Sequence, residues 1–461
     1  MLHIDTTLTP RHLLGAIGRM WQLSAVNLEA IEQTWSPDAG APVFTVNGRY
    51  TSRAWTDWTQ GFQFGSAILQ YDATGEERFL HIGRENTYRH MPVHLTHTGV
   101  HDHGFNIVST YGNLWRLMRE ERFPHDPAER RLCELALCCS GAVQAMRWAR
   151  TADGGGYIYS FNGPHSLFAD TMRTLRVLAL AHLLGHTLKG EGDQPISLLE
   201  RLIQHAQTTA RYTVYYGEGR DIYDVHGRVA HESLFNPNNG SYRAPSTQQG
   251  YSPFSTWTRA LAWVLLGFAE QLEFISALSD ADLQPFGGRT AVQELFLRPA
   301  LATADFYLRN TPTDGIPYWD TGAPGLAHLG DYLNRPSDPF NPYEPVDSSA
   351  AAIAVQGLLR LGHWLSEHAQ TEEGVRYWQA GLTVLKHLLH EPYLSVDPNH
   401  QGLLLHSVYH RPNGWDHVPD GQLIPCGEAT MWGDYHLREA CLYVQRIAQG
   451  ERYYVFFAPV Q

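Results

Sequence analysis

The feature that most constrains the fold of this chain is a helical spacing of apolar residues that recurs from end to end. Apolar side chains stand at i, i+3, i+4 and i+7 in about twelve segments, the pattern of helices with one buried face. Because strand signals are sparse, the sequence predicts an all-α protein. The helical segments are 11–34, 58–72, 76–91, 101–121, 127–149, 166–187, 195–215, 254–278, 289–309, 348–367, 371–391 and 428–449.

Several helix starts carry capping residues. Asp126, Asp193 and Asp347 each precede a helical segment, and a side-chain oxygen at that position can accept a hydrogen bond from the first turn. We therefore expect these three residues to be N-caps.

Two short hairpins are also predicted. Asn47 and Gly48 lie between alternating residues and favour a two-residue turn. The glycine-rich stretch 154–163 predicts a second hairpin. Neither hairpin is long enough to start a large sheet.

The helices follow one another at about 38 residues each, with no composition break and no linker. We therefore predict a single domain over residues 1–461. Six helical hairpins closed into a ring, an (α/α)6 barrel, match this number of helices. An α-solenoid is the alternative, but the chain has no repeat motif of the kind that solenoids show. The long loops are expected to gather at one mouth of the barrel and form a pocket.

Composition narrows the choice of partners. The formal net charge of −13 argues against nucleic acid or an anionic membrane surface as a partner. Five cysteines without a C-x-x-C pair argue against a disulfide framework. The N-terminus lacks an apolar signal region and no apolar run is long enough to span a bilayer, so we predict a cytoplasmic protein.

A run of histidines stands out at residues 90–105. His90, His94 and His97 have helical spacing, but Pro92 and Gly99 interrupt any continuous helix that would bring them to one face. The chain has no H-E-x-x-H motif. The sequence therefore predicts loop and surface histidines here, and neither a metal nor another cofactor.

Two carboxylates are better candidates for chemistry. Asp102 stands between His101 and His103 in "HDHGF", and Asp170 begins a strongly apolar helix in "FADTM". A carboxylate at a helix start can simply interact with the helix dipole. Alternatively, apolar surroundings raise the pKa of Asp170, and the carboxyl group then donates a proton near neutral pH.

An arginine and a tryptophan mark another helix start. Trp257 and Arg259 lie in "QGYSPFSTWTRALAW", and 12% of all residues are aromatic. A guanidinium that binds a carboxylate, beside an indole that packs on a sugar ring, would suit an acidic sugar. A salt bridge and a core tryptophan are the structural alternative.

Together these motifs resemble the unsaturated glucuronyl hydrolases of glycoside hydrolase family 88, which are related to unsaturated rhamnogalacturonyl hydrolases. The resemblance spans most of the chain, with its pieces in the family's order. The pieces are "HDHGF" (101–105), "FADTM" (168–172), "HESLF" (231–235), "QGYSPFSTWTRALAW" (249–263), "PYWD" (317–320), "DSSAAAIA" (347–354) and "MWGDYHLREA" (431–440).

The resemblance implies an (α/α)6 barrel that releases a Δ4,5-unsaturated uronic acid from the non-reducing end of lyase-generated oligosaccharides. The reaction hydrates the C4=C5 double bond and needs no cofactor. Asp170 matches the general acid/base and Asp102 the assisting carboxylate. The positions that match substrate-binding residues are His101, His231, Gln249, Trp257 and Arg259.

The sequence departs from the family pattern at four positions, Gln63, Gln248, Ala260 and Leu261, so the leaving sugar is not fixed by the resemblance. Three other functions remain open at this point. The first is a barrel glycosidase that hydrolyses an ordinary glycoside directly, the second is a non-catalytic sugar-binding or structural helical protein, and the third is a His-dependent metalloprotein.

Overall fold

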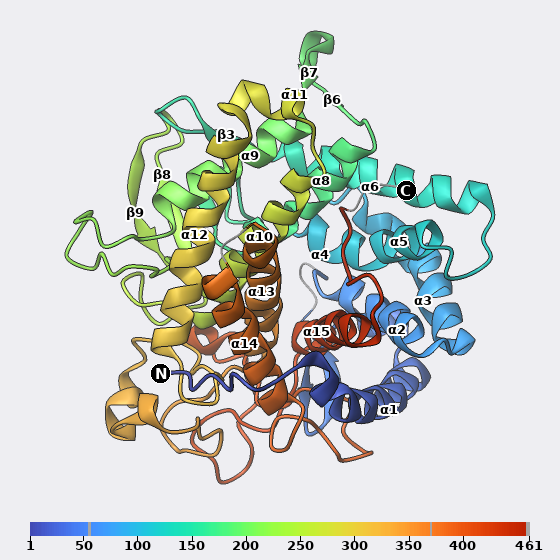
Figure 1. The fold of residues 1–461 in the computed structure, drawn as a ribbon, viewed down its shortest axis with the longest axis vertical. Helices are drawn as coiled ribbons and strands as arrows, with labels where there is room; N and C mark the ends of the chain where they lie inside the picture. The colour runs from blue at the N-terminus through green and yellow to red at the C-terminus, as the bar shows by residue number, and fades with distance from the viewer. Residues whose placement is uncertain (54–56, 369–370, 458–461) are drawn as a thin grey trace.

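The structure is a computed structural model that describes residues 1–53, 57–368 and 371–457, and its ordered elements are mostly helices (Figure 1). None of the described helices combines the length and apolar character that a membrane span needs. The helices are α1 (Pro10–Thr34), α2 (Gln60–Thr74), α3 (Glu77–His90), α4 (His103–Ile107), α5 (Asn113–Arg119), α6 (Pro127–Met146), α7 (Thr171–Thr174), α8 (Arg176–Leu183), α9 (Leu198–Tyr212), α10 (Thr258–Ser276), α11 (Asp280–Leu283), α12 (Gly288–Asn310), α13 (Ser348–Glu367), α14 (Thr371–Leu388) and α15 (Met431–Gln449).

The helices form two concentric rings. The inner ring runs from α2 through α4, α7, α10, α13 and α15, and each of these helices packs on the next. It closes because α15, near the C-terminus, packs on α2, near the N-terminus (Figure 1). An α-solenoid has no such closing contact, so this alternative is wrong for the described chain.

The two rings follow from the sequence pattern. Inner helices such as α10 and α13 are buried on every face over almost their whole length. Outer helices such as α9 and α14 bury only one stripe of side chains. A helix that is apolar on all sides is stable only when other helices surround it, and a helix with one apolar stripe can cover the outside. The chain alternates the two kinds, which gives a ring of helical hairpins.

The strands make small local sheets between the helices. Asn47 and Gly48 have φ values of 50° and 72° and turn β1 back onto β2, which confirms the first hairpin. The sheets pair β1 with β2, β3 with β4, β6 with β7, and β5 with β8 and then β9. The strands are β1 (Pro42–Val46), β2 (Arg49–Ser52), β3 (Trp148–Arg150), β4 (Gly156–Ile158), β5 (Ser166–Phe168), β6 (Leu188–Lys189), β7 (Pro195–Ile196), β8 (Glu232–Phe235) and β9 (Tyr242–Ser246).

The second predicted hairpin is misplaced. The strand in the glycine-rich stretch, β4, pairs backward with β3, so the hairpin covers residues 148–158 instead of 154–163. Its turn uses Gly154, which has a φ of 88°. Helix α6 ends at Met146, earlier than predicted, because the residues that follow belong to β3.

Two of the three predicted N-caps are confirmed. The Asp126 side chain accepts from the backbone N–H of Ala128, and the Asp347 side chain accepts from two N–H groups of α13. The prediction for Asp193 is wrong. Asp193 lies in the turn between β6 and β7, and Ser197 caps α9 by accepting from Glu200.

The centre of the inner ring holds a buried network of charges. The guanidinium of Arg173 lies 2.9 Å from Glu270 and 2.9 Å from Glu439, so it joins the segments α7, α10 and α15. Glu439 also accepts a 2.8 Å hydrogen bond from the hydroxyl of Tyr454. All four side chains are buried, so each charge depends on its partners for stabilisation.

We predict that Glu439→Gln lowers the free energy of unfolding by about 3–5 kcal/mol, because it leaves the buried Arg173 without one of its two counterions. Urea denaturation followed by tryptophan fluorescence measures this loss. The matched control is Glu218→Gln, which removes the carboxylate of an exposed pair with Arg298. That change should alter stability by at most about 1 kcal/mol. Equal losses in the two variants would contradict a structural role for the central network.

Candidate active site

A small pocket of about 50 Å³ opens where several inner helices begin. Asp102 and Asp170 stand at the N-cap positions of α4 and α7, and Trp257 stands at that of α10. The pocket therefore lies at the positive ends of these helices. Its lining residues are Trp58, His101, Asp102, Phe161, Asp170, Gln248, Gln249, Trp257, Arg259, Trp263, Tyr409, His410 and Trp415.

Both carboxylates occupy capping positions without capping their helices. The side chains of Asp102 and Asp170 make no hydrogen bond to the first turns that follow them. Asp170 lies two residues after the end of β5. The N–H of the intervening Ala169 donates to the carbonyl of His231, which fixes the junction between strand and helix. The two carboxylates are only 6% and 9% exposed, so burial without capping leaves them available for chemistry.

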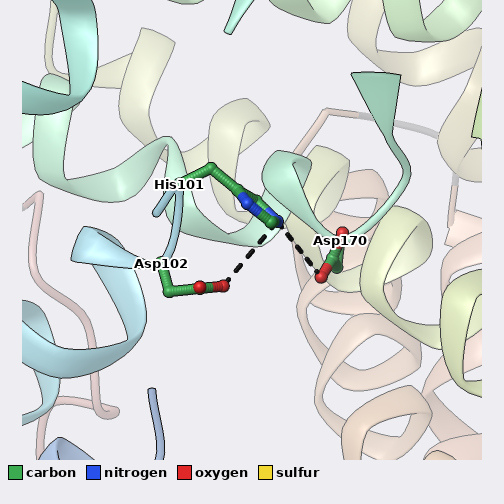
Figure 2. Close-up of side chains that lie close together, drawn as sticks. All are labelled: His101, Asp102 and Asp170. Atoms are coloured by element: carbon green, nitrogen blue, oxygen red, sulfur yellow. Dashed lines mark ion pairs between the residues drawn. The ribbon is translucent and has the colours of Figure 1, made fainter. Parts of the chain in front are cut away.

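His101 joins the two carboxylates. Its Nε2 atom lies 3.7 Å from Asp102 Oδ1 and 3.5 Å from Asp170 Oδ2. Figure 2 shows the ring of His101 directed between the two carboxylates, with a contact to each. The imidazole is 1% exposed, and its charge therefore interacts strongly with both partners.

The electrostatics of this cluster differ from the prediction for Asp170. Burial raises the pKa of Asp170, but His101 and then His231 outweigh burial, and the net pKa lies below the usual value. Burial together with the charge of Asp170 keeps the pKa of Asp102 above its usual value, although His101 opposes them. Burial lowers the pKa of His101, but the two carboxylates outweigh burial, and the net pKa of His101 lies above its usual value. The expected raised pKa therefore belongs to Asp102, because a histidine 69 residues before Asp170 stabilises the ionised Asp170.

Comparison with known proteins identifies the family of the chain. The family model for Glycosyl Hydrolase Family 88 matches residues 45–284, more than half of the chain. The chain belongs to glycoside hydrolase family 88.

The chain is also similar to several named enzymes. The unsaturated glucuronyl hydrolase of Bacillus sp. (strain GL1) is 27% identical over 95% of this chain and 98% of its own length. The unsaturated chondroitin disaccharide hydrolase of Streptococcus pyogenes serotype M1 is 25% identical over 86% and 84%. The crystal structure of the Bacillus enzyme matches with a TM-score of 0.68 over 94% of this chain and 96% of that one. The predicted (α/α)6 barrel is confirmed by this match.

In this family 88 member, six of the seven predicted site residues line the pocket, and His231 lies directly behind it. The ring of His231 is 4.7 Å from that of Trp257. Its Nδ1 accepts from the backbone N–H groups of Gln248 and Gln249 at 3.0 and 3.3 Å. Because Nδ1 is an acceptor, the proton of the neutral ring must be on Nε2.

Arg259 lies in the pocket wall, but its hydrogen-bonding capacity is largely used. Nη1 donates to Asp347 at 2.9 Å and to the carbonyl of Val408, and Nη2 donates to Gln249 Oε1 and to the carbonyl of Tyr409. Its guanidinium also stacks on Trp257 and Trp432. The predicted ion pair with a uronate would therefore have to use Nε or displace one of these acceptors.

Sequence reasoning missed several aromatic residues of the pocket. Trp58 lines it and stacks on Trp432 with a centroid distance of 5.0 Å, whereas Gln63 bonds to Gln60 within α2. Trp58 thus supplies an indole ring to the pocket wall. Four further aromatic residues of the pocket come from two loops. The high density of aromatic residues in these loops was the signal by which the sequence could have revealed them. The four residues are Phe161, Tyr409, His410 and Trp415.

The prediction that the histidines of residues 90–97 lie in loops or at the surface is wrong for His94. His94 is buried and contacts Asn106, so it is not a surface residue. His103 is also buried and bonds to Ser140 and to the carbonyl of His97.

The cluster of His101, Asp102 and Asp170 could also hold a cation, because one nitrogen or oxygen from each lies within 4.8 Å of the others. No further histidine, cysteine or acidic residue of the described chain joins this group. Structural zinc sites use four protein ligands and catalytic sites three, so the donor number alone does not decide the question. Treatment with a chelator does.

We predict that His231 stays neutral from pH 5 to pH 8, with its proton on Nε2. Burial is the main reason, since it lowers the pKa of His231 to about 4, while Asp170 opposes this shift. Nitrogen NMR of 15N-histidine-labelled protein reports both the charge and the tautomer, and His231→Gln identifies the signal. His400 is a suitable comparison, because its contact with Glu428 raises its pKa despite burial. A His231 signal that titrates near pH 6.5 would contradict the geometry.

Proposed function

We propose that this chain releases Δ4,5-unsaturated uronic acids from the non-reducing end of glycosaminoglycan-derived oligosaccharides by hydrating the C4=C5 double bond. The observation that carries the proposal is the pair of uncapped, buried carboxylates, Asp102 and Asp170, on either side of His101. The names of the relatives support the substrate class. Homologues have been crystallised with unsaturated oligosaccharides such as dGlcA-GalNAc6S.

The proposed reaction begins with proton transfer. Asp170 protonates C4 of the enol ether, which places positive charge on C5 and the ring oxygen. The ionised carboxylate of Asp102 lies on the other side of His101 and stabilises this charge. Asp170, now ionised, accepts a proton from the water that adds to C5.

The product of hydration, a hemiketal, then decomposes without further catalysis. The hemiketal at C5 opens by breaking its bond to the ring oxygen, which leaves a ketone at C5 and a hemiacetal at C1. The hemiacetal expels the leaving sugar, which keeps the glycosidic oxygen. Because no group attacks C1, the separation of the two carboxylates does not predict retention or inversion.

His101 can supply the proton that Asp170, with its lowered pKa, does not hold in the free enzyme. An acid that is ionised in the free enzyme must gain a proton before it can act. The pKa of His101 is raised by the same carboxylates, so its imidazolium can hold that proton 3.5 Å from Asp170. Binding of a uronate adds a further negative charge and favours transfer of the proton to Asp170.

The substrate is held by oriented polar groups and flat rings. Trp257 offers a stacking surface, and Gln249 presents its amide nitrogen to the pocket because its oxygen accepts from Arg259. His231 contributes an Nε2–H donor from behind. Arg259 contributes to uronate binding by fixing the orientation of Gln249. We further propose that residues 1–461 work as a single catalytic domain.

We predict that Asp170→Asn and Asp102→Asn each lower kcat by about 10³-fold, because an amide supplies neither the proton nor the negative charge. The measurement is the loss of ultraviolet absorbance of the conjugated double bond in an unsaturated disaccharide. Asp153→Asn is the matched control, since Asp153 forms a partly exposed pair with Arg211. Activity should survive a chelator. Full activity in Asp170→Asn would contradict the mechanism, and loss of activity on chelation would indicate a metal.

A second measurement separates hydration from direct hydrolysis of a glycoside. Turnover in deuterium oxide should place one deuteron at C4 in the earliest product, because C4 receives the proton from Asp170. Direct hydrolysis at C1 leaves the hydrogens of C4 unchanged. A protein that turns over saturated glycosides and not unsaturated ones would favour the second reaction, and binding without turnover would favour a sugar-binding protein.

A further inference from the structure

Within the part of the chain that the structure describes, a buried arginine beside the proposed catalytic cluster forms no ion pair with an acidic side chain. Arg147 follows the last residue of α6 and is 6% exposed. Its guanidinium donates to the carbonyls of Tyr159 at 3.2 Å and Ser160 at 2.7 Å, and to that of Thr98. Among the ion pairs of the described residues, none includes Arg147, whose contacts are carbonyl oxygens and the ring of Tyr159 at 4.4 Å.

The three carbonyls belong to two loops that reach the pocket. Thr98 lies in the loop that ends at His101 and Asp102, and Ser160 immediately precedes the pocket residue Phe161. The rings of Phe161 and His101 are 6.0 Å apart, so the two loops meet at the pocket. A planar guanidinium with several donors can hold both loops in one geometry, which a single ammonium group cannot do.

The charge of Arg147 is also placed to act on the cluster. Carbonyls orient the guanidinium but do not neutralise it, so its positive charge extends to the nearest carboxylate. It lowers the pKa of Asp102 against the larger effect of burial, and it lowers the pKa of His101. The other titratable groups that face Asp102 and His101 are Asp170 before α7, His97 in the same loop, His205 on α9 and His231 before β8.

We propose that Arg147 is a positioning residue of this active site: it ties the loop of His101 and Asp102 to the loop of Phe161 and supplies a positive charge to the cluster that these loops carry. This inference rests on the proposed function. Arg147 does not line the pocket, so it acts through Asp102 and not on the substrate.

The test compares Arg147→Met, which removes charge and hydrogen bonds, with Arg147→Lys, which keeps the charge alone. We expect Arg147→Met to lower kcat by about 10²-fold, as for a catalytic group displaced by about 1 Å. The acid limb of its pH profile should move to higher pH, because loss of the cation raises the pKa of Asp102. Arg147→Lys should restore the acid limb but only part of kcat. Arg201→Met is the matched control, since Arg201 stacks on the neighbouring Trp148.

A substrate-free measurement keeps the two proposals separable. The measurement is NMR of 15N-histidine-labelled protein, in which the His101 signal is the one that disappears in His101→Gln. The titration midpoint of His101 should move to higher pH in Arg147→Met. In Arg201→Met the midpoint should stay unchanged. Unchanged His101 midpoints and acid limbs in Arg147→Met would overturn the proposal, as would a lysine variant that titrates like the methionine variant. If the unaltered protein turns over no unsaturated substrate, the proposed function fails, and the His101 midpoints still decide whether Arg147 acts on the cluster.

Discussion

The arrangement of the inner ring depends on the ion pairs that Arg173 makes with Glu270 and Glu439 at its centre. An apolar helix can slide or rotate against its neighbours at little cost, but a buried charge that loses its partner destabilises the whole packing. Arg173 therefore fixes the register of α7 against α10 and α15. Because Asp170 stands three residues before Arg173, the same contacts fix the position of the proposed catalytic carboxylate.

The carboxylates at the mouth of the barrel differ in whether they cap the helices that they precede. Asp347 stands at the start of α13, caps that helix and pairs with Arg259, so its hydrogen bonds and its charge are used within the protein. Asp102 and Asp170 stand at equivalent places on α4 and α7 and cap nothing. The helix ends contribute positive potential at the pocket, which favours an anionic sugar there although the whole chain carries a net charge of −13.

Local patterns predicted the helices well, because apolar spacing and turn residues such as Asn47 act over a few positions. Prediction failed where a distant segment decides the structure. The helix expected over 166–187 begins only at Thr171, since the preceding residues pair with β8, which lies more than sixty residues later. The pKa of Asp170 was predicted from its apolar neighbours in sequence, whereas His101 and His231 determine its direction in space. Tertiary contacts of this kind leave no local signal.

Arg259 illustrates how a residue can matter to an anion without binding it. Its charge is balanced by Asp347, and its donors hold Gln249 and the two carbonyls of the loop that carries Tyr409. An arginine that bound the uronate directly would have to reorganise each time substrate left. A guanidinium fixed in the wall instead sets the direction of the Gln249 amide before substrate arrives, and preorganised donors of this kind need no rearrangement during the reaction. The proposed preference for a uronate would then come from the fixed orientation of neutral donors such as the Gln249 amide, beside a guanidinium whose charge Asp347 already balances.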